Sequence, residues 1–194
     1  MKKLWISLLL PLLLSSSGII TNSREILIDA GIYKVLYSEK LEQPKEVWYD
    51  VKCSSGTFSR KGLDFYTNDS VHTSSSEDYE KNVWDKGHMA PAADFSCNKE
   101  NLRQTFSYLN CALQHEKLNR GVWKNTEARE RELAKTQKVK VHISIIFTKA
   151  SEKLSTGATA PFAFKKEIIG ESEKETYYFK NEAPLLKDYL KYKI

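Results

Sequence analysis

A strict alternation of apolar and polar side chains between Val139 and Ile145 constrains the fold of this chain more than any other feature. A period of two residues places the apolar set on one face of a strand and the polar set on the other. The stretch therefore predicts a strand with one buried face. Weaker signals predict further strands at Tyr33 to Tyr37, Val47 to Val51, Phe106 to Leu109, Phe162 to Ile169 and Thr176 to Phe179.

Helical signals lie between these strands. Asn98 is placed to cap a short helix from Lys99 to Thr105, and an apolar stripe predicts a longer helix from Leu118 to Lys135. A third, short helix is expected from Leu185 to Tyr192. Because strands and helices follow no regular strand–helix–strand rhythm, the pattern indicates the α+β class.

The composition is that of one folded domain. The chain has 194 residues, of which 41% are hydrophobic and 28% charged, with only 8 Gly and 5 Pro. These values exclude a disordered, collagen-like or linker protein, and the length suits a single core. The formal net charge of +5 permits a polyanionic partner without requiring one.

The N-terminal segment has the features of a secretory signal peptide. A basic start precedes an apolar run from Leu4 to Leu14, and small residues follow. We expect residues 1–18 to be removed and residues 24–194 to form the single domain of a secreted or periplasmic protein. Removal takes away two lysines and no acidic residue, so the net charge falls from +5 to +3. The alternative is an uncleaved N-terminal anchor.

Three cysteines exclude a zinc site built from four cysteines and leave at least one thiol unpaired within the monomer. In an oxidising compartment Cys97 and Cys111 are candidates for a disulfide, and Cys53 is an equal candidate partner for either one. The sequence leaves the connectivity open.

A short motif, DKGH from Asp85 to His88, carries residue types that phosphodiester hydrolysis requires. His88 suits the base that takes a proton from water near neutral pH. Mg²⁺ takes few protein oxygens and keeps several waters, so the amide oxygen of Asn119 would serve as a ligand. Glu127 would lie roughly 12 Å beyond Asn119 along a continuous helix, at 1.5 Å per residue. We therefore expect Glu127 to act on the metal through water.

These residues also have ordinary structural interpretations. Alone, His88 would be a structural or surface histidine, Asn119 a helix N-cap and Glu127 an exposed helix acid. Trp84 and Trp123 are expected in the core. The other histidines lack a supporting pattern and are interpreted as structural or exposed; they are His72, His115 and His142.

Basic residues are scattered along the chain. Lys117, Arg120 and Lys124 lie near the start of the long predicted helix, and Lys165 and Lys166 lie on a late strand. Both sets are candidates for lining a phosphate path. The alternative is a solvated charged face.

Three segments together resemble a known family. DKGHMAPAADF, TFSYLNCALQ and LNRGVWKNTEARERELA are similar to the DNA/RNA non-specific endonucleases, which are ββα-metal (His-Me finger) nucleases of the endonuclease G type. The resemblance runs from about Ile32 to Asn181. It implies a central antiparallel sheet flanked by helices, with His88 on a β-hairpin and Asn119 on the helix that follows.

The resemblance also implies an activity and a metal. It makes His88 the general base, Asn119 the direct ligand of Mg²⁺, and Glu127 the residue that holds metal-bound water; Mn²⁺ is an alternative ion. The implied reaction is hydrolysis of DNA and RNA to 5′-phosphate and 3′-hydroxyl ends, through backbone contacts that ignore sequence.

Most of the remaining predicted site residues follow from the same resemblance. Asn110 matches an asparagine that orients the site, and Gln114 the glutamine after it, assigned to substrate binding. Arg60 sits where the family places a phosphate-contacting arginine, and Lys86 stands at the position of the motif arginine. Arg120 is added from its place near the start of the long predicted helix, as a further positive charge for the substrate.

Two departures from the family pattern motivate a second hypothesis. Lys86 replaces the usual arginine of the motif and loses its bidentate fork, and Leu113 stands where the family usually has proline. The alternative is a catalytically weak or inactive nucleic-acid-binding member of the fold, or a surface-anchored one.

Overall fold

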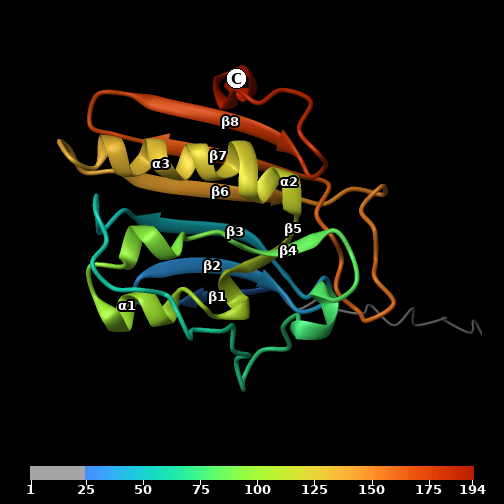
Figure 1. Cartoon of the computed structure of the whole chain (residues 1–194). Coiled ribbons are helices and arrows are strands. Elements are labelled where there is room, and N and C mark those ends of the chain that lie inside the picture. Colours follow the sequence, from blue (N-terminus) through green and yellow to red (C-terminus); the bar gives the residue numbers. More distant parts are fainter. Residues whose placement is uncertain (1–24) are drawn as a thin grey trace, which may run out of the picture.

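The computed structural model describes residues 25–194, so the predicted signal peptide at residues 1–18 lies outside the described part. Six strands form one antiparallel sheet in the order β1-β2-β3-β6-β7-β8 (Figure 1). None of the helices within residues 25–194 has the length and hydrophobicity that crossing a bilayer requires. The six strands are β1 (Glu25–Asp29), β2 (Tyr33–Ser38), β3 (Gln43–Asp50), β6 (Lys140–Ile146), β7 (Ala163–Ile169) and β8 (Lys174–Lys180).

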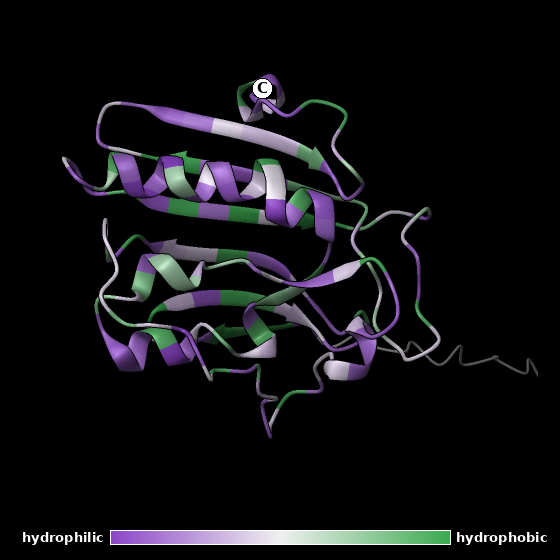
Figure 2. Ribbon diagram, in the orientation of Figure 1, coloured by the Kyte–Doolittle hydropathy of each residue, from purple (hydrophilic) through white to green (hydrophobic). Residues whose placement is uncertain are grey.

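Strand β6 has the predicted alternation. Val141, Ile143 and Ile145 are buried, while His142 and Ser144 remain partly exposed on the other face. Figure 2 shows this alternation of hydrophilic and hydrophobic residues along the strands. With strands and helices mixed along the chain, the predicted α+β class is confirmed.

The buried face of the sheet is covered by the helical segment between β5 and β6, which crosses β6 and β7 in Figure 1. The Trp123 ring packs against Phe164 at 5.4 Å and Phe179 at 5.9 Å between centroids, and it is fully buried, as expected.

The single helix predicted from Leu118 to Lys135 is wrong in detail. The segment comprises α2 (Glu116–Leu118), a π-helical turn (Asn119–Trp123) and α3 (Lys124–Leu133), because Gly121 leaves helical geometry at φ −106° and ψ −117°.

Two other predicted elements are also wrong. Phe106 to Leu109 is not a strand: the Ser107 side chain caps a 3₁₀ turn at Tyr108–Asn110 instead. Leu185 to Tyr192 is not an α-helix, because Leu185 and Leu186 are exposed and offer no buried face. Only a 3₁₀ turn, Tyr189–Tyr192, forms there.

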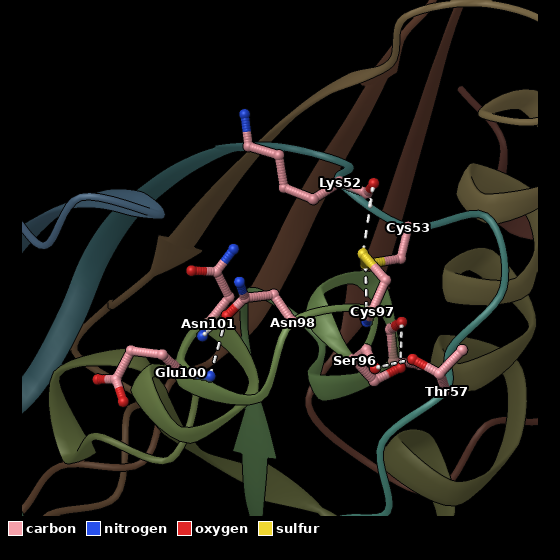
Figure 3. The surroundings of a disulfide bond; sticks show 9 residues. Lys52, Cys53, Thr57, Ser96, Cys97, Asn98, Glu100 and Asn101 are labelled. Carbon is pink, nitrogen blue, oxygen red and sulfur yellow. Dashed lines mark hydrogen bonds between the residues drawn. A yellow bond between two sulfur atoms is a disulfide. The ribbon is translucent and has the colours of Figure 1, made fainter.

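A disulfide joins Cys53 to Cys97, with 5.8 Å between their Cα atoms (Figure 3). The Cys97–Cys111 pairing considered above is therefore wrong, and Cys111 is a buried free thiol. Directly after Cys97, the Asn98 side chain accepts hydrogen bonds from the backbone of residues 100 and 101, and α1 (Lys99–Gln104) begins as predicted. The disulfide thus ties the segment after β3 to the start of α1.

Candidate active site

A separate two-stranded hairpin carries the DKGH motif. Strand β4 (Trp84–His88) pairs antiparallel with β5 (Cys111–His115), which places His88 opposite Cys111. Glycine is required at position 87, because a Cβ there would lie 2.6 Å from the Cβ of Gln114. The motif glycine therefore lets the two strands approach at the point where His88 emerges.

Side-chain amides attach this hairpin to the main sheet. The Leu113 N–H donates to the Gln43 side-chain oxygen at 2.8 Å, and the His115 N–H donates to the Asn181 side-chain oxygen at 2.8 Å. The Asn181 amide also donates to the Leu113 carbonyl at 2.9 Å. Gln43 and Asn181 are both buried, so these bonds are shielded from water.

One cavity of about 640 Å³ opens between the hairpin, the start of α3 and the segment that follows the disulfide. Most of the residues predicted from the sequence line it: Arg60, Lys86, His88, Asn119, Arg120 and Glu127. Asn110 and Gln114 do not line this cavity. The structure therefore brings the predicted base, metal ligands and phosphate-contacting charges together.

His88 is held between two aromatic rings at the cavity wall. Its ring centroid lies 4.7 Å from that of Phe65 and 4.8 Å from that of Phe106. Its Nε2 is buried and has no hydrogen-bond partner among residues 25–194. Burial, helped by the positive charge of Arg60, lowers the pKa of His88 to about 3. At neutral pH the imidazole is therefore uncharged and retains a lone pair that can accept a proton.

Asp85 fixes the orientation of Asn119. The Asn119 Nδ2 donates to Asp85 Oδ2 at 2.8 Å, and Arg120 binds the same carboxylate through Nε at 2.9 Å and NH2 at 2.6 Å. Because the amide nitrogen of Asn119 is engaged, its carbonyl oxygen remains as the acceptor available to a cation. The N-cap interpretation of Asn119 is wrong, since the His115 side chain caps this helical segment.

Glu127 lies half-buried in the same cavity, one helical segment beyond the π-helical turn. Burial raises the pKa of Glu127 to about 7, an effect opposed by the charge of Lys166 and reinforced by that of Glu130. The carboxylate oxygens of Glu127 and the free amide oxygen of Asn119 both suit a hard cation such as Mg²⁺. Within residues 25–194, no cluster of three or more His, Cys, Asp and Glu side chains is arranged to hold a metal ion.

A buried ion pair lies beneath Glu127. The Lys166 Nζ lies 3.1 Å from Glu130 Oε1, both side chains are fully buried, and the Tyr49 hydroxyl donates to the other Glu130 oxygen at 2.9 Å. Lys166 therefore cannot line a phosphate path, and that prediction is wrong. Lys165 is also engaged, because its Nζ lies 3.1 Å from Glu167 Oε1.

Two positive side chains approach the cavity from different segments. Arg60 is exposed on the segment that follows Cys53. Lys86 lies 3.3 Å from Asp64 and 5.6 Å from the Tyr108 ring centroid. Burial lowers the pKa of Lys86, but the interactions with Tyr108 and Asp64 outweigh it and raise the pKa overall. Lys86 is therefore charged and held by partners on the protein.

Asn110 and Gln114 act away from the cavity. Asn110 is fully buried and makes hydrogen bonds to the N–H and carbonyl of Ala90, each at 2.8 Å. It therefore holds the chain just after His88, and its role in orienting the site stays a prediction. Gln114 is also fully buried, without a partner for either amide atom among residues 25–194. The rings of Phe65 and Phe106 were missed by sequence reasoning, because no motif or spacing marks them.

A histidine-bearing hairpin that leads into a helix with Asn119, beside an antiparallel sheet, defines the ββα-metal (His-Me finger) nuclease class. The model of the DNA/RNA non-specific endonuclease family matches residues 13–190, and the chain belongs to this family.

Known relatives agree with this assignment. Bovine (Bos taurus) mitochondrial endonuclease G is 31% identical over 131 residues, which cover 64% of this chain and 42% of the bovine protein. A salivary endonuclease of Lutzomyia longipalpis is 29% identical over 114 residues, covering 52% of this chain and 28% of that protein. The chain thus matches less than half the length of either relative. The fold is similar to that in the EndoG/EndoGI complex, with a TM-score of 0.77 and 23% identity over 87% of this chain and 79% of the other.

Proposed function

We propose that this protein is an endonuclease that hydrolyses phosphodiester bonds in DNA and RNA without sequence preference. The observation that carries the proposal is His88, which lines a cavity shared with Asn119 and Glu127 and whose buried Nε2 has no hydrogen-bond partner among residues 25–194. An uncharged histidine with a free lone pair is what abstraction of a proton from water requires.

The residues of the cavity have complementary roles in this reaction. His88 accepts a proton from the attacking water as the water oxygen adds to phosphorus and the bond from phosphorus to the 3′ oxygen breaks. The leaving 3′ oxygen takes a proton from solvent, which gives 5′-phosphate and 3′-hydroxyl ends. Arg60 and Lys86 place positive charge beside the phosphate, where negative charge grows in the transition state. The Asp85 carboxylate keeps Asn119 oriented throughout.

The oxygen atoms in this cavity suit one divalent cation, Mg²⁺, with Mn²⁺ as the alternative. Asn119 would bind it directly through its amide oxygen, and Glu127 would hold one of its water ligands. When bound, the ion polarises the phosphate and stabilises the leaving oxygen. Asp85 and Arg120 then serve the metal site indirectly, by fixing the asparagine.

Export to an oxidising compartment is part of the proposal, either secretion or transfer to the periplasm. It rests on the signal-like sequence at residues 1–18, which would leave a single domain at residues 24–194. The Cys53–Cys97 disulfide supports it, because disulfides persist in such compartments. The name of the salivary relative favours a secreted role, whereas the names of the mitochondrial relatives do not.

One observation favours the second hypothesis, a weak or inactive nucleic-acid-binding protein. The Lys86 ammonium is already engaged by Asp64 at 3.3 Å and lacks the second donor group that an arginine would offer to a phosphate. If the absence of bidentate hydrogen bonding by an arginine limits catalysis, replacing Lys86 by arginine would raise the cleavage rate.

Cleavage of plasmid DNA and of RNA by the purified protein tests the proposal. The parent should cut both with Mg²⁺ and neither with EDTA. His88→Ala should abolish cleavage, whereas the matched variant His72→Ala should cut like the parent, because His72 is exposed and pairs with Glu42 outside the cavity. A parent that binds nucleic acid but leaves it intact with both Mg²⁺ and Mn²⁺ would favour the binding protein. A His88→Ala variant that cuts normally would refute His88 as the base.

A further inference from the structure

A second groove, of about 410 Å³, lies beside the candidate active site. One wall is the segment from α2 to the start of α3, which contributes Lys117, Arg120 and Lys124. The other wall is the chain after β8, which contributes Pro184, Leu186 and Lys187 and is drawn in red in Figure 1. Arg120 and Lys124 also line the active-site cavity, so the two hollows adjoin at these side chains.

The charge of this groove is positive on both walls. No acidic residue lines it. Arg120 is held by Asp85 and Glu116, at 2.6 Å and 3.4 Å. The ammonium groups of Lys117, Lys124 and Lys187 have no carboxylate within 4.0 Å in the part of the chain that the structure describes, in contrast to the paired Lys165 and Lys166. These three cations are therefore free to bind an external anion.

The arrangement suits a chain of phosphates better than a single anion. The free lysines stand on opposite walls and are exposed, so none is preorganised around one point. Several separate, solvated cations along an open groove match the regularly spaced charges of a polynucleotide backbone. Leu186, which is exposed, adds apolar surface to the lining of the groove.

We propose that this basic groove, defined by Lys117, Lys124 and Lys187, binds the backbone phosphates of the same strand whose scissile bond lies at His88. The inference rests on the proposed nuclease function and adds the path of the strand: it leaves the active site across the π-helical turn and passes between α2 and the segment after β8. The C-terminal segment thereby becomes part of the substrate site.

Binding of single-stranded oligonucleotides tests this path. Fluorescence anisotropy in EDTA, which stops metal-dependent cleavage, would compare labelled strands of increasing length with the full protein. The test variant is Lys117→Glu/Lys187→Glu. The control, Lys34→Glu/Lys138→Glu, changes the net charge equally; Lys34 lies on the opposite face of the sheet and Lys138 beyond the far end of α3.

The parent and the control variant should bind long strands more tightly than short ones. The test variant should not show this increase of affinity with strand length. Each lost phosphate contact weakens binding roughly fivefold at 0.1 M salt, so two contacts give about a 25-fold higher Kd and a salt slope smaller by about 1.4. Equal binding by the test and control variants would refute phosphate binding in the basic groove and would leave the nuclease proposal intact. A parent that neither binds nor cuts any strand would overturn the proposed function itself.

Discussion

Removing the disulfide between Cys53 and Cys97 should cost this protein a large part of its stability. The Cys53–Cys97 bond spans 44 positions of sequence. It holds the segment that carries Phe58, Arg60 and Phe65 against residues 92–96, and both segments line the active-site cavity. The perturbation is the double variant Cys53→Ser/Cys97→Ser.

The expected loss follows from the size of the closed loop. In the chain-entropy treatment, a loop of about 44 residues restricts the unfolded chain by about 13 cal/mol/K, or about 4 kcal/mol at 25 °C. With a urea m-value of about 2 kcal/mol/M, this loss lowers the unfolding midpoint by about 2 M. Since whole domains are stable by roughly 5–15 kcal/mol, the loss is a large fraction of the total.

Urea unfolding followed by tryptophan fluorescence, with and without dithiothreitol, measures this loss. The reductant should lower the urea unfolding midpoint of the parent to that of the double variant. It should not change the midpoint of the double variant. Cys111→Ala is the matched control, because it removes the free cysteine and keeps the disulfide. A double variant within about 1 kcal/mol of the parent would refute the loop-entropy argument.

Three further predictions concern the site and its support. Glu127 has a pKa raised from 4.5 to about 7, so its contribution to the stability of the metal-free protein is present below pH 4.5 and is lost as the pH rises through 7. Glu127→Gln should therefore raise the free energy of unfolding at pH 8, by up to about 3 kcal/mol, but not at pH 4, as urea titrations at the two pH values will show. Lys166→Met should cost about 3–5 kcal/mol, because it leaves Glu130 buried without its cation; a thermal melt that matches the parent would contradict this. Gly87→Ala should destabilise the hairpin by about 1–3 kcal/mol, since the new Cβ would collide with Gln114, and a rise in Tm would contradict the close approach.

Local patterns in the sequence predicted much of the site. The alternation around Ile143 predicted strand β6 directly, because that signal is contained within a short stretch. The hairpin that carries His88 followed only from the resemblance of the motifs to the family. The family followed from the same motifs. The roles of individual residues stay predictions until cleavage is measured.

Features that depend on distant contacts could not be predicted. Cys53 is far from Cys97 in sequence, and spacing could not distinguish it from Cys111 as the partner. Lys166 looked like a surface cation, but it lies on the same buried face of β7 as Phe164 and Ile168, and Glu130 comes from another element. The rings around His88 meet only after the chain has folded, and the π-helical turn at Gly121 has no periodic signature.

The attachment of the histidine hairpin has a consequence for cooperativity. The amide side chains of Gln43 and Asn181, rather than a ladder of main-chain bonds, join β5 to the main sheet. We expect the amide protons of the hairpin to exchange with solvent ahead of those of β6 and β7, because few main-chain hydrogen bonds would have to break for it to separate from the sheet. Natural variation at these two positions would change the motion of the active site without altering any residue that faces the phosphate.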